Sequence, residues 1–235
     1  MRGIAVVCAL VSAIGVARAA DLPMGVPPAP PPVQAAYNWS GFYLGGNLGA
    51  AFANLSETAT IIGGPFAGTS ATGNSSGNAI VAGVQGGFNW QVDRLVLGVE
   101  GDFDFSGLNA KSPSGSPVNV TTRWESLSTI RGRVGAAFDR LLVYGTAGVA
   151  FVDMHTTITA AGLGTLFDAR QVDTGWTAGA GIDYAYSPNW IVRAEYLYVD
   201  TNLSLSGALT GSGGTLSYTG PLKQNIIRTG FNYKF

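Results

Sequence analysis

The chain has 235 residues, of which 46% are hydrophobic and only 11% are charged, and its formal net charge is −1. A charge this close to neutral excludes the strongly basic surface that nucleic-acid binding requires. Beyond the N-terminus, no stretch reaches the ~20 consecutive apolar residues of a membrane helix. An apolar, weakly charged chain of this kind forms either an all-β core or a β-barrel in a lipid bilayer.

The N-terminus has the pattern of a secretory signal peptide. A positively charged start precedes an apolar run, Ile4–Val16, which is followed by an A-x-A cleavage site formed by Ala17 and Ala19. We expect residues 1–19 to be a signal peptide; a short membrane anchor is the competing interpretation. The single cysteine, Cys8, lies inside this segment, so the processed chain is not a disulfide-stapled scaffold.

Residues 20–36 are rich in proline, including the run Pro30-Pro31-Pro32. Such a run favours polyproline II and does not fit a central strand, because proline lacks the N–H group that a sheet needs. We therefore predict a periplasmic linker over residues 20–36, followed by a barrel domain over residues 37–235. A proline-rich ligand for a binding partner is the alternative for the linker.

From Gly41 onward, apolar and polar residues alternate in segments that end with Ile227, Thr229, Phe231, Tyr233 and Phe235 on one face. A period of two indicates strands, because successive side chains point to opposite faces of a sheet. Eight strands are predicted, at Gly41–Ala53, Ala79–Trp90, Leu95–Ser106, Arg123–Phe138, Leu141–Met154, Thr174–Tyr186, Trp190–Asp200 and Gln224–Phe235.

The connections between these strands alternate between short and long. Short turns, such as Asp139-Arg140, alternate with polar, glycine-rich loops at about 54–78, 107–122, 155–173 and 201–223. Short periplasmic turns and long extracellular loops are typical of outer-membrane barrels. The predicted fold is therefore all-β, an eight-stranded antiparallel up-and-down transmembrane β-barrel.

The short turns also predict the register of neighbouring strands. Three pairings keep apolar side chains on one face: Trp90 with Leu95, Phe138 with Leu141, and Tyr186 with Trp190. The first pairing places Gln85 opposite Glu100. A slip of one residue would turn every side chain to the wrong face, so the agreement of all three turns supports the assigned faces.

Nearly every charge in the predicted strands falls on the inward face, as expected if Arg or Lys at the lipid midplane costs ~2–4 kcal/mol. Asp183 should lie opposite Arg193. With Arg123 and Lys234, the inward acids and bases balance. We predict that the lumen ion pairs are formed by Glu100, Asp102, Asp104, Glu125, Arg131, Arg133, Asp183, Arg193, Glu195 and Arg228.

An eight-stranded barrel has an interior only just wide enough for side chains. We therefore interpret the inward charges as a lumen plugged by ion pairs, with a charged pore or proton path as the alternative. His155 is the sole histidine, and no Ser/His constellation, metal-ligand cluster or phosphate-binding loop is found. The sequence thus predicts no catalytic, cofactor-binding or metal-binding residues, no cofactor, and no enzymatic activity.

Several motifs resemble a known family. They are Trp39–Asn47 (WSGFYLGGN), Gly98–Asp102 (GVEGD), Arg131–Gly135 (RGRVG), Ala137–Arg140 (AFDR), Gly175–Gly181 (GWTAGAG), Arg193–Asp200 (RAEYLYVD) and Asn232–Phe235 (NYKF). In order and spacing they resemble the small porin-like outer-membrane proteins of alphaproteobacteria, the RopB family.

The resemblance implies an OmpA-like barrel in the outer membrane of a Gram-negative bacterium, among outer-membrane lipids and lipopolysaccharide. It also implies that a C-terminal assembly signal, Phe231, Tyr233 and Phe235, is read by the barrel-insertion machinery. The leading functional hypothesis is a structural barrel that contributes to envelope integrity and surface properties. The alternatives are a porin-like channel for small solutes and a surface adhesin or receptor that acts through its extracellular loops. The sequence does not specify an oligomeric state.

Overall fold

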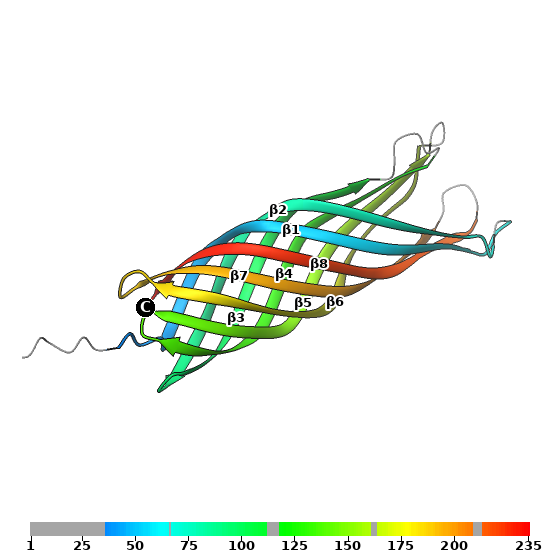
Figure 1. The fold of residues 1–235 in the computed structure, drawn as a ribbon. Helices are drawn as coiled ribbons and strands as arrows, with labels where there is room; N and C mark the ends of the chain where they lie inside the picture. The colour runs from blue at the N-terminus through cyan, green and yellow to red at the C-terminus, as the bar shows by residue number, and fades with distance from the viewer. Residues whose placement is uncertain (1–35, 66, 112–117, 161–163, 209–212) are drawn as a thin grey trace, which may run out of the picture. The chain divides into compact units, whose positions relative to one another are not determined.

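The structure, a computed structural model, describes residues 36–65, 67–111, 118–160, 164–208 and 213–235. Eight antiparallel strands follow one another around a closed barrel (Figure 1). They are β1 Gly41–Ile62, β2 Ser70–Val92, β3 Leu95–Lys111, β4 Val118–Phe138, β5 Leu141–Ala160, β6 Gly164–Ala185, β7 Trp190–Ala208 and β8 Thr215–Lys234. The predicted all-β, up-and-down barrel is confirmed. The predicted signal peptide and almost all of the predicted linker lie outside the described residues.

The register agrees with the prediction at two of the short turns and differs at the third. Phe138 pairs with Leu141, and Asp183 pairs with Arg193, as expected. Between β2 and β3, however, Leu95 pairs with Val92 rather than with Trp90. The predicted pairing was wrong by two residues because the turn contains only Asp93 and Arg94.

The tighter turn is possible because Asp93 adopts a φ of 53°, in the left-handed region that aspartate tolerates better than most residues. The shift brings Gln85 opposite Asp102 and Gly87 opposite Glu100. A shift of two residues keeps every side chain on its predicted face, because the period of a strand is also two. The inward and outward assignments in β2 and β3 are therefore unaffected.

In the part of the barrel near the short turns, the outer surface is apolar and the interior is polar. On β8, Ile227, Phe231 and Tyr233 are exposed on the outside, whereas Arg228 and Asn232 are buried inside. Corresponding exposed apolar side chains occur on every strand, among them Phe42, Val84, Val99, Ile130, Val149, Ile182 and Val192. We call this ring the apolar band, and its composition is that of a lipid-facing surface.

Farther from the short turns, the same strands exchange the polarity of their two faces. On β8, Leu216, Tyr218 and Leu222 are buried inside, while Thr219 and Lys223 are exposed outside. The strands therefore continue well beyond the apolar band, into segments that the sequence predicted to be loops. That prediction was wrong because the polar, glycine-rich composition was taken to indicate loops, whereas these segments are strands whose inner faces carry apolar residues.

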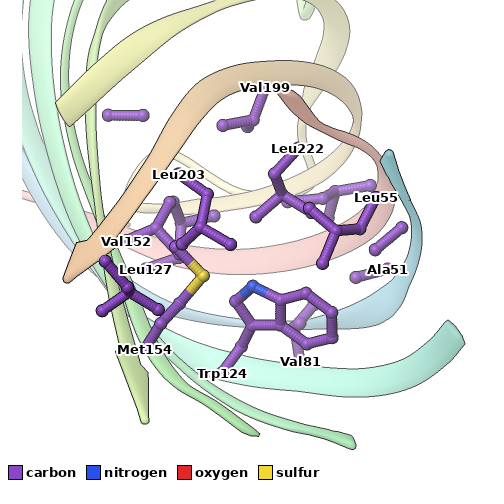
Figure 2. Packing of buried hydrophobic residues seen from close by; sticks show 14 of the residues in the cluster. Ala51, Leu55, Val81, Trp124, Leu127, Val152, Met154, Val199, Leu203 and Leu222 are labelled. Atoms are coloured by element: carbon purple, nitrogen blue, oxygen red, sulfur yellow. The ribbon is translucent and has the colours of Figure 1, made fainter. Parts of the chain in front are cut away.

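The inward apolar side chains of these extensions form one cluster, which we call the outer cluster. It includes Ala51 and Leu55 of β1, Trp124 and Leu127 of β4, Val152 and Met154 of β5, Val199, Leu203 and Leu205 of β7, and Leu222 of β8. Figure 2 shows side chains from several strands pointing into this shared interior. The extension therefore has an apolar core of the kind found in water-soluble proteins.

Beyond the apolar band, the ring of strands divides into two sheets. In the described residues, the pairing of β2 with β3 ends at Val81 and Ser106, and that of β6 with β7 ends at Gly175 and Thr201. The other ladders continue, so that β3 to β6 form one sheet and β7, β8, β1 and β2 form the other. Figure 1 shows that both sheets extend toward the end of the barrel opposite to the C-terminus.

The face assignment makes a direct prediction for Val99, which lies on the outside of β3 and is 62% exposed. Val99→Arg should block or strongly reduce folding into lipid vesicles, because an arginine within the bilayer costs about 2–4 kcal/mol. The folded fraction can be measured by heat-modifiable electrophoretic mobility. The control is Thr219→Arg, which is also exposed on the outer face but lies beyond the apolar band. Equal folding of the two variants would contradict the position of the band.

Candidate functional site: the ionic lumen

The lumen at the level of the apolar band holds a network of buried ionic side chains. Nine of the predicted residues meet there: Glu100, Asp102 and Asp104 of β3, Arg131 and Arg133 of β4, Asp183 of β6, Arg193 and Glu195 of β7, and Arg228 of β8. Alternation directs these side chains inward, and neighbouring strands place them at similar depth. We call this set the lumen network.

Arg131 joins two walls of the barrel. Its Nη2 atom lies 2.5 Å from Glu100 Oε1 and 2.8 Å from Asp102 Oδ2, while its Nη1 atom lies 3.0 Å from Glu195 Oε1. The side chain has no exposed surface. Buried charges must be paired and hydrogen-bonded to be tolerated, and the five N–H donors of an arginine suit this task.

Asp183 is shared by two arginines nearer the short turns. Arg193, directly opposite on β7, places its Nε atom 2.8 Å from Asp183 Oδ1, and Arg133 places its Nη2 atom 2.8 Å from Asp183 Oδ2. Arg193 also donates a hydrogen bond to Glu100 Oε2. Glu100 therefore links the group around Asp183 to the group around Arg131.

Arg228 of β8 completes the network on the other side of the lumen. Its Nη1 atom lies 2.7 Å from Asp104 Oδ2, and its Nη2 atom lies 2.7 Å from Glu195 Oε2 and 3.2 Å from Asp102 Oδ2. The network thus links β3, β4, β6, β7 and β8 through charge-assisted hydrogen bonds, which are the stronger kind. Each of these carboxylates is bound by at least one guanidinium group.

Two tyrosines that the sequence analysis did not assign to the site complete the network. The Tyr43 hydroxyl donates a hydrogen bond to Glu100, and the Tyr144 hydroxyl donates one of 2.9 Å to Glu195. The guanidinium carbon of Arg133 lies 3.8 Å from the centre of the Tyr144 ring, a cation–π contact. Their inward register was the signal that could have identified both tyrosines.

Glycines on the inner wall make room for these large side chains. A Cβ atom added to Gly87 would lie 2.5 Å from the Tyr43 hydroxyl, and one added to Gly148 would lie 2.0 Å from the carbonyl oxygen of Ile130 and 2.7 Å from the Arg131 Cα atom. Glycine is needed here because a neighbouring strand occupies the space that a side chain would fill. The glycine-rich sequence therefore fits the crowded lumen.

Glu125 was predicted to belong to the lumen ion pairs, and that prediction was wrong. Its side chain is 41% exposed and lies 2.8 Å from Arg170 on the outer surface. The pairing of β4 with β5 shifts register between Trp124 and Ser126, as at a β-bulge. The extra residue reverses the alternation, so that Trp124 turns inward and Glu125 turns outward.

Two of the expected inward bases also lie outside the network. Arg123 is exposed beyond the bulge, and Lys234 is partly exposed at the short-turn end. The predicted balance between acids and bases was therefore wrong for the lumen. The buried network has one more carboxylate than guanidinium group.

The charges on the outer face of β4, β5 and β6 form a separate surface group. Arg170 contacts Asp153 at 2.6 Å as well as Glu125, and His155 lies 2.9 Å from Asp168. The hydrogen bond to Asp153 is the main cause that raises the pKa of Arg170. Because these side chains are exposed or partly exposed to water, the pairs stabilise the fold little.

Apolar groups cover the lumen network at both ends. The outer cluster lies on one side, and on the other side Trp39 packs with Val96, Ala137, Leu142, Tyr144, Ala185 and Ile191. Among the described residues, no group of three or more His, Cys, Asp or Glu side chains is arranged to hold a metal ion. The described part of the chain also has no helix that is long and apolar enough to cross a membrane.

Comparison with known proteins identifies the family. Residues 6–235 match the family described as the outer membrane protein beta-barrel domain. The chain belongs to this family. The predicted location in the outer membrane is confirmed, and the short turns of such barrels face the periplasm while the longer hairpins face the cell exterior.

The relatives of this outer-membrane barrel are alphaproteobacterial, as the sequence motifs indicated. A 31 kDa outer-membrane immunogenic protein of Brucella melitensis is 33% identical over 238 residues, covering 93% of each chain. A 25 kDa outer-membrane immunogenic protein of Brucella abortus is 32% identical, covering 93% of this chain and 91% of the relative. A 22 kDa outer membrane protein of Rhizobium leguminosarum is 29% identical, covering 87% and 82%.

Among solved structures, the outer membrane protein OprG of Pseudomonas aeruginosa resembles this barrel with a TM-score of 0.51 and 15% identity, covering 83% of this chain and 96% of that one. This similarity shows the fold. The predicted assembly signal lies on the outer face of β8 and directly after its end: Phe231 and Tyr233 of β8 are 50% and 37% exposed, and Phe235, which follows Lys234, is 72% exposed. Its recognition by the insertion machinery stays a prediction.

The inner-wall glycines yield a test of lumen packing. Gly148→Ala should lower the folded fraction of the barrel, because the new methyl group would meet the backbone of Ile130 and Arg131. Gly132→Ala is the matched control, since Gly132 lies on the outer face and the nearest atom to an added Cβ is 4.0 Å away. Refolding yields in detergent micelles measure the difference. If both variants folded equally well, the crowding of the inner wall would be disproved.

The lumen network yields a second test. Arg131→Met should lower the free energy of unfolding by about 3–5 kcal/mol, because three carboxylates lose a buried cationic partner. Arg170→Met removes an arginine that also pairs with two carboxylates, but on the exposed surface, and should cause no measurable change. Urea unfolding in lipid vesicles compares the two. A similar loss in both variants would show that burial is not what gives the network its importance.

Proposed function

We propose that this outer-membrane protein is a structural, non-conducting barrel that contributes to envelope integrity and supports a rigid extension at the cell surface. The lumen network is the observation that carries the proposal. It occupies the interior at the level of the apolar band and joins five of the eight strands by buried ion pairs.

The packing of the lumen argues against the porin-like alternative. A continuous aqueous path would have to pass Arg131, Arg193 and Arg228, whose side chains are at most 1% exposed and are held by carboxylates on other strands. It would also have to cross the outer cluster, where apolar side chains do not favour water. Opening such a path requires breaking several buried ion pairs together.

The extension supports the second half of the proposal. Its outer faces carry polar and charged residues, such as Thr219, Lys223 and Arg170, while the apolar residues of the outer cluster are turned inward. A stiff double sheet beyond the bilayer presents a defined surface to the medium. The Brucella relatives are named as immunogenic outer-membrane proteins, which fits a surface-exposed structure of this kind.

Single-channel recording of refolded protein in a planar lipid bilayer tests the proposal. We expect no stable conductance steps from preparations that are shown to be folded by heat-modifiable mobility. An established porin, inserted in the same bilayer system, controls for detection. Reproducible steps of nanosiemens size would overturn the proposal and favour the channel.

A further inference from the structure

The short segment before β1, residues Tyr37 to Ser40, crosses the periplasmic end of the barrel. Trp39 is completely buried and packs against inward side chains of later strands, including Val96, Leu142 and Ile191. Trp39, the first residue of the motif Trp39–Asn47, therefore packs against later strands although it precedes the first strand. The segment lies against the mouth of the lumen.

Residues in or just before each of the three short turns of the barrel contact this segment. At the end of β2, Gln91 Oε1 accepts a hydrogen bond of 2.7 Å from Trp39 N. In the β4–β5 turn, the Asp139 carbonyl accepts a bond of 3.0 Å from Trp39 Nε1, and its carboxylate accepts one of 3.1 Å from Tyr37 N. In the β6–β7 turn, the Pro188 carbonyl accepts a bond of 3.1 Å from the Tyr37 hydroxyl.

The C-terminal strand supplies a fourth anchor. Lys234 donates a hydrogen bond to the carbonyl oxygen of Asn38, and its ammonium nitrogen lies 4.8 Å from the centre of the Tyr37 ring. Beneath the segment, Tyr144 belongs both to the apolar group around Trp39 and to the lumen network. The segment therefore covers the periplasmic side of the network.

The segment is attached to the barrel differently from a strand. Its contacts run to turns and side chains rather than along a ladder, and the ladder begins only at Gly41. Gly41 has a φ of 131°, and an added Cβ would lie 3.2 Å from the carbonyl oxygen of Phe235. Glycine adopts this conformation without the strain that another residue would incur, so Gly41 is suited to act as a hinge.

We propose that residues Tyr37 to Ser40 form a periplasmic lid, hinged at Gly41, that docks after the barrel has closed and excludes periplasmic water from the lumen. The order follows from sequence separation. The anchors lie between 52 and 196 residues beyond the groups that they bind. The docking site does not exist until the last strands are in place, so that the lid closes as a final step of assembly.

Thiol accessibility tests whether the lid excludes water. In a chain carrying Cys8→Ser, Ile191→Cys places a single thiol beneath Trp39. Adding Trp39→Ala should increase its labelling by a water-soluble maleimide by at least about tenfold, because protection depends on local opening. The matched control is Trp176→Ala, an exposed tryptophan on the outer face of β6, which should leave the rate unchanged. An unchanged rate in folded Trp39→Ala protein would overturn the lid.

If Trp39→Ala does not fold, a second pair of substitutions provides the test. Tyr37→Leu with Lys234→Met removes the contacts of Tyr37 with Pro188 and of Lys234 with Asn38 but leaves the buried indole in place. Labelling should increase to an intermediate rate. No increase in these folded variants would also count against the lid. The order of events is tested in refolding from urea, where protection of the thiol should lag behind the shift in electrophoretic mobility. Simultaneous changes would refute late docking.

Discussion

Each strand of this barrel passes through two solvents, and the rest of the structure depends on that constraint. A strand offers one face to the interior and one to the surroundings, and its side chains alternate between these faces except where a bulge intervenes, as in β4. Within the bilayer the outer face must be apolar, so the polar residues turn inward. Beyond the bilayer the outer face meets water, and the same backbone carries the opposite pattern.

The lumen network is the consequence of this constraint within the membrane. Charged side chains that face acyl chains cost about 2–4 kcal/mol, and in this interior they are almost completely buried. The remaining solution is to pair them with one another. This happens through Arg131, Arg193 and Arg228, each of which binds carboxylates from more than one strand. Such pairing repays the loss of hydration only where the geometry is good, and the tyrosine hydroxyls at Glu100 and Glu195 improve it further.

Much of this arrangement could be predicted from sequence because an error of two residues in strand pairing leaves every side chain on the same face. The faces of β3 and the opposition of Asp183 and Arg193 follow from alternation and from a tight turn. The pairing of β2 with β3 could not be fixed in this way, since shifting it by two residues preserves every face. Glu125 could not be placed either, because a bulge reverses the alternation without an obvious mark in the sequence. Alternation places Tyr43 and Tyr144 on the inner face, but their partners in the network follow only from the register of the whole barrel.

Because the ring divides into two sheets beyond the apolar band, different interactions hold the strands together in the two parts of the chain. Within the membrane, an unbroken circuit of hydrogen-bonded strands and the surrounding lipid hold the barrel together. Above it, the two sheets are joined across their seams mainly by the side chains of the outer cluster, as in a water-soluble sandwich. Urea and temperature act on that contact through the hydration of apolar surface. Under denaturing conditions the two sheets can therefore separate while the cylinder in the membrane stays intact.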